Sequence, residues 1–313
     1  MAILIKPSVD PASRWIALLK TYAPEEETRV WPDIGNPEDI EFAIIRRPPP
    51  GALARCVNLR WVASIPAGVE PLLDPDLVPP TVPIVRCVSE NRAREMGEYV
   101  LLQALRLHRR IPEYEAMRGR GEWGRLEQPP TGSRRAGVMG LGELGATVAQ
   151  TLANAGFSTA AWTRTAREMT GALASVEGFH GPGGWVPFLA RTDILVCVLP
   201  LTPHTQGILN AQCFADLPQG AAVINVSRGA HLVEDDLLAA LEGGHLSGAC
   251  LDVVSVEPPP PDLPVLHHRG ICVTPHIACR SRAEDLLPGL LDNMQRARDG
   301  RALRNRVERA RGY

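Results

Sequence analysis

The sequence has no hydrophobic run long enough to cross a membrane and no large excess of charge of either sign. The formal net charge of −2 over 313 residues argues against a surface that binds nucleic acid, because such surfaces are strongly basic. The first residues form one apolar pentad, soon followed by Lys6, Pro7 and Asp10. They lack the basic start and long apolar stretch of a signal peptide, so we expect a first strand there.

Metal-binding and disulfide patterns are also missing. The seven cysteines include no C-x-x-C pair, and their number is odd, which predicts neither a zinc site nor a disulfide framework. Most of them lie in or beside apolar, strand-like segments, as is typical of buried, reduced thiols. We therefore expect a cytoplasmic protein with no metal centre.

The chain is long enough for two domains, and short apolar segments alternate with helical patterns along it. This alternation predicts an α/β fold, with two Rossmann-like or flavodoxin-like lobes, doubly wound parallel sheets and a cleft between the lobes. The polar, glycine-containing segment 111–135 is expected to be an extended arm or loop. Strands are expected at 2–5, 42–45, 59–65, 84–88, 136–139, 157–162, 194–199, 222–226, 248–253 and 271–274, and helices at 13–22, 89–110, 146–155, 234–242 and 284–298.

A strand, a glycine turn, a helix and a second strand follow one another in residues 136–165. The turn has the G-x-G-x-x-G spacing, with Gly140 for the tight turn, Gly142 for close approach to a pyrophosphate and Gly145 for helix packing. The start of the helix, Glu143 and Leu144, offers free N–H groups to phosphates. The segment therefore predicts a dinucleotide site.

The second strand of this unit ends without the acidic residue that holds the ribose of NAD. Thr163, Arg164 and Thr165 follow instead, and the first carboxylate is Glu168. An arginine between two hydroxyls suits a 2′-phosphate, since each charge-assisted hydrogen bond contributes about 1.5–3 kcal/mol. We therefore predict NADP(H) in preference to NAD(H); the alternative for Arg164 is an ordinary surface position.

Arg228, Glu257 and His276 each follow an expected strand, and the carboxyl ends of such strands line one crevice. For each residue alone, a surface or structural role is the alternative. Together they suit carbonyl reduction: histidine supplies a proton, the carboxylate fixes the ring, and arginine grips a substrate carboxylate. A 2-oxoacid is the substrate that uses all three. Asp252, at a strand end, is a candidate contact for the nicotinamide carboxamide.

On these residues the chain resembles the D-isomer-specific 2-hydroxyacid dehydrogenases, and within them the bacterial glyoxylate/hydroxypyruvate reductase A branch. The matching segments are GLGELG at 140–145, WTRT at 162–165, LPLTPHTQGILN at 199–210, INVSRGAHLVEDDLLAALEGGHLSGACLDV at 224–253 and VTPHIA at 273–278. The resemblance implies reduction of glyoxylate to glycolate and of hydroxypyruvate to D-glycerate, with Arg228, Glu257 and His276 catalytic. It implies a homodimer with no nucleic-acid or membrane partner.

The resemblance also implies two domains and further contacts. Residues 1–97 with 282–313 would form the substrate-binding lobe, and residues 98–281 the NADP-binding Rossmann domain. The cofactor would also contact Leu199, Pro200 and Val226, near the ends of two strands. Backbone N–H groups of Ala67, Gly68 and Val69, in a loop of the first lobe, would hold the substrate carboxylate.

Some residues depart from the family pattern. Pro66 stands where the family usually has glycine, and proline contributes no N–H. Arg46 and Arg47 follow the strand 42–45, and Arg280 follows His276. These cations leave open a dehydrogenase for another, more acidic or larger 2-hydroxyacid. A second alternative is a non-catalytic protein that senses NAD(P)H on the same scaffold.

Overall fold

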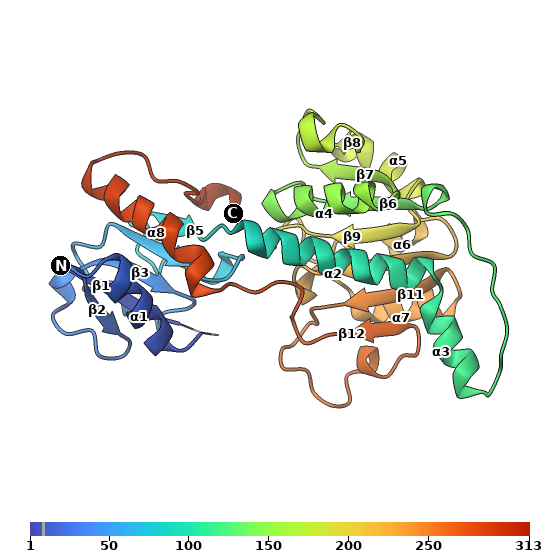
Figure 1. Ribbon diagram of the computed structural model, residues 1–313, viewed down its shortest axis with the longest axis horizontal. Helices are drawn as coiled ribbons and strands as arrows, with labels where there is room; N and C mark the ends of the chain where they lie inside the picture. The colour runs from blue at the N-terminus through green and yellow to red at the C-terminus, as the bar shows by residue number, and fades with distance from the viewer. Residues whose placement is uncertain (8–9) are drawn as a thin grey trace. The chain divides into compact units, whose positions relative to one another are not determined.

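The computed structural model describes residues 1–7 and 10–313, and the chain forms two compact units. Unit 1 comprises Met1–Arg92 and Arg280–Tyr313, and unit 2 comprises Ala93–Cys279. Each unit contains one parallel sheet, so the predicted α/β class with two parallel sheets is confirmed (Figure 1). Within the described residues, no helix combines the length and apolarity that a membrane crossing requires.

Unit 1 has a five-stranded sheet in the order β2-β1-β3-β4-β5, and every neighbouring pair is parallel. Helices α1 and α8 pack side by side on one face of this sheet, where Trp15 and Leu290 join its apolar core (Figure 1). Apolar side chains from the segment 53–82 cover the other face. The elements are β1 (Ala2–Lys6), α1 (Ala12–Tyr22), β2 (Glu27–Val30), β3 (Ile40–Ile45), β4 (Trp61–Ser64), β5 (Ile84–Arg86) and α8 (Ala283–Arg298).

Unit 2 has a seven-stranded parallel sheet in the order β12-β11-β10-β9-β6-β7-β8. The chain reverses direction across the sheet between β6 and β9, which is where open α/β sheets bind ligands. Helix α2 (Glu90–His108) begins in unit 1 and continues in unit 2. The other elements are α3 (Ile111–Gly119), β6 (Arg135–Met139), α4 (Glu143–Asn154), β7 (Ser158–Thr163), β8 (Glu177–His180), α5 (Trp185–Ala190), β9 (Ile194–Cys197), α6 (Ala211–Ala215), β10 (Ala221–Asn225), α7 (Glu234–Glu242), β11 (Leu246–Leu251) and β12 (Ile271–Val273).

Alternation along the strands of unit 2 sends neighbouring side chains to opposite faces of the sheet. Val138 joins the core beneath α2 and α4, whereas the next residue, Met139, joins the core beneath α5, α6 and α7. The sheet is therefore buried on both faces, which explains the nearly continuous apolar runs of its strands. Short 3₁₀ helices lie at Pro37–Asp39, Glu70–Leu72, Thr131–Ser133, Gly171–Leu173, Pro182–Gly184, Gly229–His231, Pro264–Leu266 and Arg309–Arg311.

The expectation of an extended arm over residues 111–135 is wrong in its first part, because residues 111–119 form α3. Arg110 takes a left-handed conformation, with φ of 58°, and Pro112 lies in the first turn of the new helix. No residue of α3 is buried, so the helix has no apolar face that a periodicity argument could detect.

Candidate active site

The turn between β6 and α4 brings three glycines together. Gly140 has φ of 94°, in the left-handed region that favours glycine. A β-carbon on Gly145 would lie 2.0 Å from the carbonyl oxygen of Gly140, so only glycine lets α4 approach the turn this closely. A β-carbon on Gly142 would meet no heavy atom within 4 Å. The backbone at Gly142, with Glu143 and Leu144 opening the helix behind it, is thus free to approach a pyrophosphate.

The polar cluster at the end of β7 lies beside this turn. Oγ1 of Thr163 donates to the carbonyl oxygen of Thr165 at 2.8 Å, which tightens the chain around Arg164. Arg164 and Thr165 are exposed. The guanidinium of Arg167 donates to the carbonyl oxygen of Leu141, inside the glycine turn. Two arginines therefore stand around the position where the dinucleotide motif places phosphate groups.

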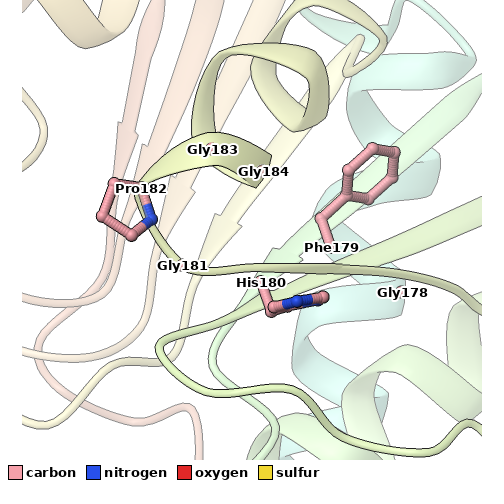
Figure 2. Close-up of a pocket in the computed structure, with 7 residues that line it drawn as sticks. All are labelled: Gly178, Phe179, His180, Gly181, Pro182, Gly183 and Gly184. Carbon is pink, nitrogen blue, oxygen red and sulfur yellow. The ribbon is translucent and has the colours of Figure 1, made fainter.

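A pocket of about 500 Å³ adjoins the same strand end and is lined by residues 178–184 (Figure 2). The N–H of Gly181 donates to the carbonyl oxygen of Thr163 at 2.9 Å, so the pocket wall is attached directly to β7. His180 pairs in register with Thr163, and paired residues of parallel strands extend from the same face of a sheet. His180 is thereby added to the polar side chains at this end of β7.

Arg228 follows β10 in a loop that buried groups hold from both sides. Nδ2 of Asn225 donates to the carbonyl oxygen of Arg228 at 3.0 Å. The N–H of Arg228 donates to Nδ1 of the buried His231 at 3.3 Å, and the other ring nitrogen lies 3.2 Å from the carbonyl oxygen of Pro200. Nδ1 also lies 3.2 Å from the carbonyl oxygen of Arg228, so the ring contacts both backbone groups of that residue. The Arg228 backbone is therefore pinned between β10 and the loop after β9.

The loop of Arg228 also contacts the loop after β11. A β-carbon on Gly229 would lie 1.8 Å from the carbonyl oxygen of Val254, so the two backbones touch where glycine has no side chain. Glu257 follows three residues after Val254. Arg228 and Glu257 thus belong to two loops that pack directly on each other.

Asp252 holds the segment that contains His276. The aspartate is buried, and its Oδ1 accepts from Oγ1 of Thr274 at 2.7 Å and from the N–H of Ile277 at 2.8 Å. Its Oδ2 accepts from the N–H of Ala278 at 2.8 Å, and its carbonyl oxygen accepts from the N–H of His276 at 2.9 Å. These four bonds fix the backbone of His276, which has φ of 56°. The contact of Asp252 with a nicotinamide carboxamide stays a prediction.

Helix α2 reinforces this network through Tyr99. Its hydroxyl forms a short hydrogen bond with Oγ1 of Thr274, whose proton goes to Asp252. Burial raises the pKa of Tyr99, so the phenol keeps its proton and acts as the donor. The resulting chain of donors runs from α2 to the carboxylate beneath the His276 segment.

His276 and Glu257 are joined directly. Nδ1 of His276 lies 2.8 Å from Oε2 of Glu257, and the two side chains are 46% and 37% exposed. A carboxylate on Nδ1 fixes the ring and keeps a proton on that nitrogen. Nε2 is then the ring nitrogen left to exchange a proton with a bound molecule. The partial exposure of the side chain gives a small molecule access to it.

The remaining cofactor-site predictions lie at the carboxyl ends of β9 and β10. The side chain of Leu199 lies against the glycine turn, 3.1 Å from where a β-carbon on Gly140 would be. The carbonyl oxygen of Leu199 accepts from Oγ of Ser227. Val226 is buried, and Pro200 accepts the bond from His231 described above. All these residues line the same edge of the sheet as Arg228.

The predicted carboxylate-binding loop belongs to unit 1 and follows β4. Oγ of Ser64 donates to the carbonyl oxygens of Pro66 and Gly68, which shapes the loop. Within the part of the chain that the structure describes, the N–H groups of Ala67, Gly68 and Val69 donate no hydrogen bond to the protein. Three donors remain available there although Pro66 supplies none.

Three residues of unit 2 that bear on this site were not predicted from the sequence: His180, His231 and Tyr99, through its hydroxyl. Tyr99 lies within the helix expected at 89–110, and apolar periodicity takes no account of its phenol oxygen. His231 follows Arg228 by three residues, and a histidine between apolar neighbours was the available signal for a buried, hydrogen-bonded ring. His180 lies in an exposed edge strand, where the pattern gave no signal.

Known proteins have sequences related to this chain. Residues 101–278 match the family model described as D-isomer specific 2-hydroxyacid dehydrogenase, NAD binding domain. Among curated proteins, a glyoxylate/hydroxypyruvate reductase A from Serratia proteamaculans is 39% identical and covers 85% of each chain. The protein of that name from Yersinia enterocolitica is 36% identical over 96% of each chain.

Solved structures are similar to this chain along its whole length. A D-isomer specific 2-hydroxyacid dehydrogenase from Xanthobacter autotrophicus, in complex with NADPH and MES, is 37% identical with a TM-score of 0.94. The match covers 100% of this chain and 99% of that one. An NADPH-dependent glyoxylate/hydroxypyruvate reductase from Sinorhizobium meliloti, in complex with NADP and sulfate, is 33% identical with a TM-score of 0.91 and full coverage of both chains.

Proposed function

The chain belongs to the D-isomer specific 2-hydroxyacid dehydrogenase family, and from this premise we propose that it reduces small 2-oxoacids with NADPH. The proposed reactions are glyoxylate to glycolate and hydroxypyruvate to D-glycerate, which the names of its relatives support. The observation that carries the proposal is the hydrogen bond of 2.8 Å between His276 and Glu257, on a loop fixed by buried Asp252.

The residues around the glycine turn fit NADPH. The open backbone at Gly142 and the start of α4 suit the pyrophosphate, and Arg164 with the hydroxyls of Thr163 and Thr165 suits the 2′-phosphate. Arg167, which reaches into the turn, adds a second positive charge. Relatives crystallised with NADPH or NADP support this preference. When bound, this cofactor supplies the hydride for the carbonyl carbon.

The protein's own residues bind the substrate and supply its proton. Arg228 pairs with the substrate carboxylate, and its two-donor face also polarises the neighbouring carbonyl. Nε2 of protonated His276 donates to the oxygen that becomes the hydroxyl. Glu257, on Nδ1, aims the ring and balances its charge while that proton is held. The free N–H groups of Ala67–Val69 in unit 1 add donors for the carboxylate.

A panel of 2-oxoacids tests the proposal. Purified protein is mixed with NADPH and, in turn, glyoxylate, hydroxypyruvate, phenylpyruvate and a phosphorylated 2-oxoacid, and NADPH loss is followed by absorbance. We expect the highest kcat/KM with glyoxylate or hydroxypyruvate. A preference for the larger or phosphorylated acids would assign the chain to another 2-hydroxyacid, as Arg46 and Arg47 allow. NADPH binding without turnover on any acid would indicate a sensor.

We also propose a homodimer. Exposed apolar side chains occur on the second half of α2, at the start of α3 and in the loop that follows it. They include Leu102, Ile111 and the fully exposed Trp123. Burying such side chains against a second copy removes apolar surface from water. Light scattering during gel filtration should give twice the chain mass of 34.0 kDa. A measured mass equal to that of one chain would contradict the dimer.

A cytoplasmic location is a further proposal. All seven cysteines are free thiols, which is typical of proteins kept in a reducing compartment. Cell fractionation should recover the reductase activity with cytoplasmic marker enzymes; recovery with the periplasm or membranes would overturn this.

A further inference from the structure

Two cysteines face each other across neighbouring strands of unit 2. Cys250 of β11 and Cys272 of β12 are Cα partners in the parallel register, and their side chains are hydrogen-bonded to each other. Neighbouring strands lie about 4.7–4.9 Å apart, and a disulfide needs Cα atoms about 4.4–6.8 Å apart. The strand register thus already holds the two Cα atoms at a spacing that a disulfide can bridge.

The two thiols differ in access. Cys250 is 1% exposed and belongs to the apolar core beneath α2, whereas Cys272 packs at the edge of that core and is partly exposed. A small oxidant therefore reaches Cys272 first. Cys250 is protected from solvent but lies within reach of any group formed on Cys272. This division is that of an attacking and a resolving thiol.

A cation lies beside the pair. Arg106 of α2 interacts electrostatically with both thiols, and Glu115 of α3 holds its guanidinium through two hydrogen bonds. Nε of Arg106 is buried and has no hydrogen-bond partner in the described part of the chain. The hydrogen bond from Cys250 lowers the pKa of Cys272, and the charge of Arg106 lowers it further, against burial and Glu115.

We propose that Cys250 and Cys272 form a thiol pair that hydrogen peroxide converts to a reversible intramolecular disulfide. The thiolate sulfur of Cys272 attacks one peroxide oxygen, the O–O bond breaks, and hydroxide leaves with a proton as water. Sulfur of Cys250 then attacks the sulfenic sulfur of Cys272, the S–O bond breaks, and the thiol proton of Cys250 leaves with that oxygen as a second water. The two thiols lose two electrons, which the peroxide gains.

The test is the fate of the thiols in the full-length protein after a brief exposure to hydrogen peroxide. Free thiols are alkylated, and the digested protein is examined by mass spectrometry. We expect a peptide pair linked through Cys250 and Cys272, the loss of two of the seven free thiols, and their recovery with dithiothreitol. Cys279, which is similarly exposed, should keep its thiol, and Cys279→Ser should leave the link unchanged.

Two variants separate the roles of the pair. In Cys250→Ser, the sulfenic acid on Cys272 should persist and react with dimedone; in Cys272→Ser, no link and no dimedone adduct should form on Cys250. Sulfinic acid on Cys272 without a link in the unmodified protein would overturn the proposal. Oxidation of all seven thiols at similar rates would overturn it as well. Neither result bears on the reductase assignment, because the measurement needs no turnover.

The role of Arg106 has its own control at Arg109, just past the end of α2. Arg106→Gln should slow formation of the link by about tenfold, since an adjacent cation favours the thiolate. Arg109 donates to Gln128 rather than lying beside the two thiols. Arg109→Gln should therefore leave the rate of link formation unchanged. Equal rates in both variants, with unchanged melting temperatures, would contradict the assigned role of the cation.

Discussion

Nδ1 of His276 lies 2.8 Å from Oε2 of Glu257, although the two residues leave different strands of the sheet. In the proposed reaction this carboxylate aims the ring and balances its positive charge. Glu257→Gln keeps the size of the side chain but removes the charge. We expect kcat to fall about 10- to 100-fold, with the NADPH dissociation constant unchanged. Steady-state rates and NADPH titration check this, with Glu242→Gln on the exposed end of α7 as the control. An unaltered kcat would remove Glu257 from the mechanism.

Asp252 holds the backbone segment that carries the ring of His276. In Asp252→Asn, an amide NH₂ replaces one carboxylate oxygen and meets N–H or O–H donors from Thr274, Ile277 or Ala278. We expect a loss of about 1–3 kcal/mol in the free energy of unfolding and a lower kcat, because a buried donor loses its acceptor. Denaturant titration and kinetics on one preparation check both effects. Asp262→Asn, at an exposed position, is the control; equal behaviour of the two variants would refute the positioning role.

Arg164 is proposed to bind the 2′-phosphate that distinguishes the two nicotinamide cofactors. Arg164→Ala should raise the KM for NADPH about 10- to 100-fold, the equivalent of about 1.5–3 kcal/mol for a charge-assisted bond. The KM for NADH should change little. Arg125→Ala, at an exposed position in the loop after α3, should alter neither value. A parallel rise for both cofactors would show that Arg164 does not read the 2′-phosphate.

Gly229 tests whether the loops of Arg228 and Glu257 must touch. A β-carbon there would lie 1.8 Å from the carbonyl oxygen of Val254, so Gly229→Ala forces the loops apart. We expect a destabilisation of about 1–3 kcal/mol and a fall in kcat/KM, because overpacking displaces the backbone next to Arg228. Gly119→Ala, in α3, places the same methyl group in open space and should be neutral. Full activity of Gly229→Ala would show that Arg228 does not depend on this contact.

The parts of the fold that were predictable are those with a local signal. Buried parallel strands such as 194–197 are continuous apolar runs, and the glycine spacing at 140–145 specifies its own turn. The edge strand β8 and the exposed helix α3 have no apolar pattern because neither buries a full face, so both were missed. Neither element has an apolar face whose spacing can be recognised in the sequence.

The site divides in the same way. That Arg228, Glu257 and His276 follow strands of one sheet could be deduced from the order of the elements, since parallel strands share one carboxyl edge. The hydrogen bonds that hold the backbone around these three residues could not be deduced in this way. The bond from Tyr99 to Thr274 joins residues 175 positions apart, and the ring of His231 bonds to a proline 31 positions earlier. Such contacts depend on the packing of α2 and of neighbouring loops, which no local pattern encodes.

The most direct test of the account is a single turnover of His276→Ala with NADPH and glyoxylate at saturation. Glycolate should form about 10²- to 10⁴-fold more slowly than with the unmodified protein, because the proton donor is gone while cofactor binding is intact. His267→Ala, an exposed histidine that precedes β12, serves as the control and should react at the normal rate. Glycolate formation by His276→Ala at the normal rate would contradict the account.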